Sequence, residues 1–170
     1  MPSSILFMSS SDFGVGRDGS LLHNIQSGYS LVLFYSTQCP HCAAAQDIFK
    51  ELNKTVIGCK FAMINIDNNK NIIQICKQSI LPIEYVPLLV FFANGKAYMM
   101  YSGPLREQNI RQFIEQVATA YAEEYSSNDG QKTFIENFEG CGIDDQQCKE
   151  DYVKRQRGCY VTMKEAYSNK

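Results

Sequence analysis

Residues 31–42 read Leu-Val-Leu-Phe-Tyr-Ser-Thr-Gln-Cys-Pro-His-Cys, and the rest of the chain is organised around this stretch. Its first five residues are an apolar run with the composition of a short buried strand. Beyond the second cysteine, apolar residues recur at the spacing of one helix face, at Ala45, Ile48, Phe49 and Leu52. The four residues from Cys39 to Cys42 are therefore predicted to form the turn between a strand and a helix.

This turn has the chemistry of a reactive thiol pair. Pro40 fits the first helical position, where its missing N–H leaves no hydrogen bond unmade, so Cys39 stands at the helix N-terminus. The free N–H groups and the helix dipole there favour the thiolate form. We therefore expect Cys39 to be the exposed nucleophile and Cys42, on the same side of the first turn, to be its shielded partner. The pair can cycle between dithiol and disulfide.

Composition indicates one globular domain with an appendage. Hydrophobic residues make up 45% of the 170 positions and charged residues 20%, and the net charge is -2. This charge gives no long-range attraction to nucleic acid or to an anionic membrane, so we expect neither partner. The longest apolar run, Val86–Ala93, is shorter than the ~20 residues that a spanning helix needs. Without a basic leader at residues 1–8, we expect a cytoplasmic protein that could be packaged in a virion.

The first part of the chain combines one short strand with polar segments. A strand is predicted at residues 5–8, followed by a flexible loop over Ser9–Ser20 and a short helix over Leu21–Gln26. The loop contains the glycine spacing of a dinucleotide-binding fingerprint. That motif should open into a long helix and carry an acidic residue about 20 positions on, where this chain has Phe34. A flexible loop is therefore the better interpretation.

Strands and helices alternate along the middle of the chain, which is typical of an α/β sheet with parallel crossovers. A third strand is predicted at Phe61–Asp67, and apolar residues on one helix face follow it up to Ile80. The run Leu88–Phe92 then precedes Asn94-Gly95, a strong hairpin signal, so we expect an antiparallel hairpin to close the sheet. A last amphipathic helix is predicted over residues 106–124.

This order of elements resembles the thioredoxin superfamily, over roughly residues 5 to 124. The resemblance rests on the strand before Cys39 and on three further stretches, which are residues 64–67, 86–96 and Tyr101-x-Gly103. It implies a thioredoxin-like α/β fold with a mixed central sheet flanked by helices. By the same resemblance, Pro87 is the cis-proline that faces the cysteine pair, and the backbone of Val86 pairs with an extended substrate segment.

The chain also departs from thioredoxin itself. Gln38 replaces the usual tryptophan before the motif, and Leu33 and Met63 replace the buried Asp–Lys pair that relays a proton to the second thiol. The Pro40-His41 dipeptide instead resembles bacterial periplasmic disulfide oxidases and shares its histidine with protein disulfide isomerases. When protonated, His41 would stabilise the thiolate and make the disulfide form easier to reduce. We therefore expect a pair more oxidising than that of thioredoxin.

Residues 125–170 lie beyond the resemblance and are predicted to be a helical C-terminal extension after a domain of residues 1–124. They hold Cys141, Cys148 and Cys159 and a helix predicted over Asp144–Ala166. Along such a helix Cys148 and Cys159 stand about 16 Å apart, too far for a direct disulfide. Three roles stay open: a helical cap on the domain, a partner-binding or dimerising arm, and a redox element that exchanges with the cysteine pair.

The leading functional hypothesis is an enzyme, a thiol-disulfide oxidoreductase that acts on protein thiols and disulfides and needs an unidentified electron donor or acceptor. The alternatives are a non-catalytic binding module on the same scaffold and a glutathione-dependent glutaredoxin.

A zinc half-site is the competing interpretation of the CxxC, but no second CxxC or His pair has finger spacing, so we expect neither metal nor cofactor. Cys59 and Cys76 are expected to be buried small hydrophobes, and His23 to be solvated. Richness in Lys, Ile and Asn suggests a large DNA virus as the source.

Overall fold

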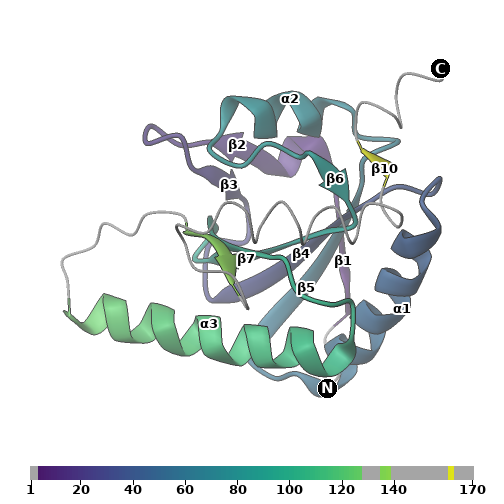
Figure 1. Ribbon diagram of the computed structural model, residues 1–170. Helices are drawn as coiled ribbons and strands as arrows, with labels where there is room; N and C mark the ends of the chain where they lie inside the picture. Colours follow the sequence, from purple (N-terminus) through teal and green to yellow (C-terminus); the bar gives the residue numbers. More distant parts are fainter. Residues whose placement is uncertain (1–3, 128–134, 139–160, 163–170) are drawn as a thin grey trace.

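The apolar run before Cys39 forms an inner strand of the sheet in the computed structural model, which describes residues 4–127, 135–138 and 161–162 (Figure 1). The strands are β1 (Leu6–Met8), β2 (Phe13–Val15), β3 (Leu21–His23), β4 (Tyr29–Tyr35), β5 (Cys59–Asn65), β6 (Tyr85–Val86), β7 (Leu88–Ala93), β8 (Lys96–Tyr101), β9 (Ile135–Phe138) and β10 (Val161–Thr162). The helices are η1 (Ser10–Asp12), α1 (Pro40–Thr55), α2 (Asn71–Gln78) and α3 (Glu107–Ser127).

Within the described residues the main sheet is mixed and has the order β1-β5-β4-β7-β8-β3-β2, with β9 paired to β8. Strand β4 is parallel to β5 and antiparallel to β7, so Leu33 lies opposite Met63 on one side and Leu89 on the other. Strands β1 and β5 are also parallel. This arrangement confirms the predicted thioredoxin-like fold class.

The two faces of the sheet carry separate hydrophobic cores. Leu31 and Leu33 point to the face covered by α1 and α3, and Val32 and Phe34 point to the face covered by α2. Figure 1 shows α2 and α3 on opposite sides of the sheet. All four of these β4 side chains are fully buried, as expected for a continuous apolar run in a central strand.

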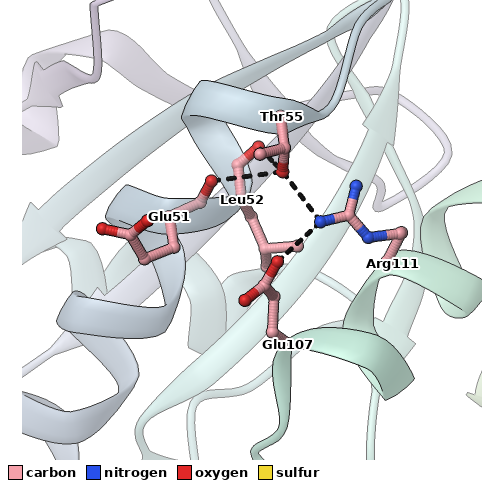
Figure 2. A network of polar contacts seen from close by, with 5 residues as sticks. All are labelled: Glu51, Leu52, Thr55, Glu107 and Arg111. Atoms are coloured by element: carbon pink, nitrogen blue, oxygen red, sulfur yellow. Dashed lines mark hydrogen bonds and ion pairs between the residues drawn. The ribbon is translucent and has the colours of Figure 1, made fainter.

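A polar contact joins the two helices on the α1 face (Figure 2). The guanidinium of Arg111 on α3 donates from Nη2 to Thr55 Oγ1 at the end of α1, at 2.8 Å, and forms an ion pair with Glu107 one turn earlier, at 2.6 Å. The Thr55 hydroxyl in turn donates to the carbonyl of Glu51, at 3.2 Å. These groups are largely exposed, so hydrophobic packing holds the helices together and this network orients their ends.

Residues 9–26 differ from the prediction. Instead of a flexible loop and a short helix, the structure has η1 and a hairpin of β2 and β3, in which Gly14 lies opposite Leu22. Leu21 and His23 are buried while Leu22 is half-buried, which is the alternation expected of a strand. The strand is only three residues long, so this alternation was too short to be recognised in the sequence. Since Leu22 pairs with Lys96, β3 and β2 extend the sheet beyond the β7–β8 hairpin. The expectation that this hairpin closes the sheet is therefore wrong.

Two short segments of the C-terminal extension are described, and both are strands. β9 runs parallel to β8, with Ile135 opposite Met99, and β10 runs antiparallel to β6. The helix expected over Asp144–Ala166 is therefore wrong at Val161–Thr162. Cys141, Cys148 and Cys159 lie outside the described residues. In the described part of the chain, no helix combines the length and apolar character that crossing a membrane requires.

Candidate active site

The cysteine pair lies at the carboxyl end of β4. After β4 the chain turns through Ser36, Thr37 and Gln38, and α1 begins at Pro40 with extended backbone at Cys39 before it. The strand-to-helix turn is therefore formed as predicted, with Pro at the first helical position, where its missing N–H disturbs nothing.

Cys39 contacts the backbone just ahead of Pro87. Its thiol donates to the carbonyl oxygen of Val86, with 3.7 Å between Sγ and O, and the Val86–Pro87 peptide bond is cis, as the resemblance implied. Cys39 is only 2% exposed, so the expectation of an exposed thiol is wrong. The reason lies in the tertiary structure. The side chain of Cys39 packs in the core on the α2 face together with Val86, which lies 47 residues further along the chain.

Cys42 is shielded, as predicted. Its side chain has no exposed surface, and its sulfur accepts a hydrogen bond from the backbone N–H of Ser36 at 3.5 Å. Burial is the main cause that raises the pKa of Cys42 far above its ordinary value, and hydrogen bonding with the neighbouring Cys39 adds to the effect. Cys42 is therefore held as a neutral thiol, and the structure contains both thiols in the free form.

Asp67 is the polar residue of this site that sequence reasoning did not single out. Its carboxylate accepts hydrogen bonds from the hydroxyl of Ser36 at 2.9 Å, and from the N–H and hydroxyl of Thr37, both at 2.8 Å. Its charge also contributes to the raised pKa of Cys42. A signal was present, because Asp67 follows β5, and the carboxyl ends of the parallel strands β4 and β5 meet at one edge of the sheet.

The other site residues named from the sequence have simple placements. Pro40 is exposed and His41 is half-buried in the first turn of α1, where it stands beside the pair. Val86 is fully buried. The roles of Pro40 and His41 in tuning the thiols, and of Val86 and Pro87 in binding substrate, stay predictions.

His23 is buried rather than solvated. It is 6% exposed, its Nδ1 accepts the N–H of Ile25 at 3.1 Å, and its Nε2 therefore carries the proton that bonds Ser30 Oγ at 2.9 Å. Its ring lies 4.1 Å from that of Phe92, centroid to centroid. Burial lowers the pKa of His23 to about 4, so the ring is neutral near pH 7.

Cys59 and Cys76 are buried, as expected for small hydrophobes, and burial raises the pKa of each thiol to about 12. They therefore stay protonated and unreactive at neutral pH. Across residues 4–127 and the described parts of the extension, no group of three or more His, Cys, Asp and Glu side chains could hold a metal ion.

Comparison with known proteins adds three findings. Residues 19–116 match the thioredoxin family model. Two uncharacterized proteins of invertebrate iridescent viruses are similar to this chain. Protein 196R of invertebrate iridescent virus 6 is 32% identical over 98 residues, which cover 58% of this chain and 56% of that protein. Protein 020R of invertebrate iridescent virus 3 is 26% identical over 152 residues, which cover 86% of this chain and 84% of that protein. These relatives agree with the viral source that the composition suggested.

A homolog of the thiol:disulfide interchange protein TxlA from Synechocystis is 32% identical over 111 residues, which cover 64% of this chain and 59% of that protein. Among solved structures, human ERp44 in crystal form I superposes with a TM-score of 0.51 at 21% identity, over 68% of this chain and 30% of that one. This likeness is one of fold. The matched part of this chain thus spans little more than half the length of 196R and of the TxlA homolog, and less than a third of ERp44.

Proposed function

This chain belongs to the thioredoxin family, and from that premise we propose that it is an enzyme that exchanges disulfides with protein substrates through Cys39 and Cys42. The observation that carries the proposal is the pairing of two free thiols at a helix N-terminus, one of which touches the backbone carbonyl of Val86 beside the cis peptide bond.

In the reducing direction, the thiolate of Cys39 attacks one sulfur of a substrate disulfide. A mixed disulfide forms and the first substrate thiolate leaves. Cys42 then loses its proton and attacks the sulfur of Cys39, so the second substrate thiolate leaves and the Cys39–Cys42 disulfide remains. Two electrons pass to the substrate, and the reverse sequence oxidises a substrate dithiol. The raised pKa of Cys42 supports this division of roles, since a thiol that stays protonated is a poor first attacker.

Four proteins test this proposal: the wild type, Cys39→Ser, Cys42→Ser, and Cys59→Ala as a control cysteine outside the site. We expect the wild type and Cys59→Ala to reduce insulin with dithiothreitol as electron donor, or to oxidise reduced RNase with glutathione disulfide. Cys39→Ser should be inactive in both assays. Full activity of Cys39→Ser would contradict the proposal.

The redox potential of the pair is proposed to lie between that of thioredoxin and that of the bacterial oxidase. Those two potentials differ by roughly 150 mV, or about 7 kcal/mol for two electrons. When His41 is protonated, its charge at a half-buried position would supply a fraction of this, about 1–2 kcal/mol, by stabilising the Cys39 thiolate. Equilibration with glutathione should show His41→Pro to be more reducing than the wild type. The control is Gln38→Ala, since Gln38 is exposed and directly precedes Cys39, and this variant should leave the redox potential unchanged.

The burial of Cys39 favours a second candidate, a binding module that keeps the thioredoxin scaffold without catalysis. This candidate predicts no activity with insulin or RNase and no alkylation of Cys39 in the folded protein. Turnover in either assay that depends on Cys39 would exclude it.

A further inference from the structure

The strand edge beside Cys39 already has an occupant. β6 lies outside the main sheet, and in the described structure its partner is β10 from the C-terminal extension, with Val161 opposite Val86 and Thr162 opposite Tyr85. Figure 1 shows β10, in yellow, next to β6. The carbonyl of Val86, the last residue of β6, is the group that Cys39 contacts.

This position bears directly on the reactivity of Cys39. A thiolate that attacks a protein disulfide must be reached by the substrate sulfur, yet Cys39 is 2% exposed and Val86 is fully buried. The edge at which an extended substrate segment would lie against Val86 is the edge that β10 fills. A substrate segment and β10 therefore compete for the same backbone groups.

We propose that β10 is an internal occupant of the substrate-binding edge of β6, so that this strand keeps Cys39 closed until an extended polypeptide segment displaces it. This inference rests on the proposed function in one respect, namely that the displacing segment belongs to a thiol or disulfide substrate. The pairing of β10 with β6 itself is a property of the fold.

The chemistry of the exchange suits a reversible closure. Strand addition to a sheet edge takes its affinity from main-chain hydrogen bonds, which any extended segment can supply, so one strand replaces another with little net change in bonding. β10 is only two residues long, so its pairing is weak by itself. It is favoured because the chain tethers it near its site and raises its effective concentration there.

The test compares three full-length proteins. The double-proline protein carries Val161→Pro and Thr162→Pro, which together remove both N–H groups of β10. Because successive N–H groups of a strand point to opposite sides, one of the two faces β6, and the double variant removes it in either case. Val161→Ala with Thr162→Ala, the matched control, keeps both N–H groups and shortens both side chains. Far-ultraviolet circular dichroism confirms that all three proteins are folded.

The readout is the rate at which iodoacetamide alkylates Cys39, measured by mass spectrometry of the peptide that contains it. We expect the double-proline protein to react about tenfold faster than the wild type, which corresponds to a closing free energy of about 1.4 kcal/mol, while the double-alanine protein stays close to the wild type. A synthetic peptide with the sequence of residues 155–168 should slow the double-proline protein again. Equal rates in all three proteins, or no effect of the peptide, would overturn the inference.

A second readout separates this inference from the proposed function. With a disulfide-containing extended peptide as substrate, the double-proline protein should show a lower KM and an unchanged kcat. If Cys39 is alkylated faster in that protein but no variant turns over the peptide, insulin or RNase, then the closing role of β10 stands and the proposed enzymatic function fails.

Discussion

Among single residues, Asp67 shows how a site can be assembled from two separate strands. It follows β5 but binds the turn that follows β4, and its charge acts on Cys42. It is therefore a positioning residue, which orders the turn before Cys39 and helps to keep Cys42 protonated.

We predict that Asp67→Asn lowers the pKa of Cys42, because it removes a negative charge that opposes the thiolate while keeping an acceptor for Thr37. The shift should be small, since burial is the largest cause of the raised pKa and the charge of Asp67 is the smallest. The pH dependence of Cys42 alkylation in a Cys39→Ser background measures it. Asp47→Asn, which removes an exposed charge further along α1, is the control, and an equal shift in that variant would contradict a specific role for Asp67.

The two cysteines should differ strongly in reactivity. We expect alkylation to modify Cys39 in preference to Cys42, because burial keeps the Cys42 thiol protonated. Accordingly, Cys42→Ser should trap covalent complexes with substrates under non-reducing conditions, and Cys39→Ser should not. Preferential labelling of Cys42 would reverse the assigned roles.

His23 should make the stability of the protein depend on pH. Its pKa is lowered from 6.5 to about 4 on folding, so the unfolded chain binds more protons between these values. The contribution of His23 is thus fully present above pH 6.5 and declines as the pH falls toward 4. We expect a loss of about 2 kcal/mol between pH 7 and pH 5 in urea unfolding. That loss should be much smaller in His23→Gln, and an identical pH dependence in the variant would refute it.

At the scale of elements, the β7–β8 turn is the best test of how local geometry supports the fold. Gly95 has φ +82°, and a Cβ there would lie 2.9 Å from the carbonyl oxygen of His23. Gly28 has φ +80° with open space around it. The two glycines therefore share the same backbone conformation and differ in their surroundings.

We predict that Gly28→Ala lowers the free energy of unfolding by about 1 kcal/mol, the cost of a left-handed conformation for alanine. Gly95→Ala should cost roughly 1–3 kcal/mol more, because the new methyl group collides with the backbone of the segment after β3. Urea unfolding of the two variants measures the difference. Equal losses would show that β3 moves aside without penalty.

For the whole molecule, the division into residues 1–124 and a C-terminal extension stays a prediction that truncation can test. Among the described residues, the two cores run from Met8 to Val117, with partly buried residues packed around them as far as Tyr121. A chain that ends at Ser127 should therefore keep cooperative unfolding, with a lower midpoint because β9 and β10 no longer pair with β8 and β6. Loss of cooperativity would show that the extension completes the core.

Local features were determined by the sequence itself. The strand and helix on either side of Cys39, the Asn94-Gly95 hairpin and the amphipathic α3 all depend on composition, spacing and turn chemistry within a few residues, and all are present in the structure. The shielding of Cys42 in the first helical turn follows from the same local geometry.

Only the tertiary structure decided what these elements meet. The burial of Cys39, the carboxylate of Asp67 at the turn, the strand at Leu21–His23 and the position of β10 beside Val86 each depend on contacts between segments remote in sequence. Periodicity reports which face of an element is apolar, but it does not report which backbone edge or side chain lies opposite. For that physical reason, the sequence located the cysteine pair at the strand-to-helix turn, and the three-dimensional fold determined the burial and the electrostatic surroundings of the two thiols.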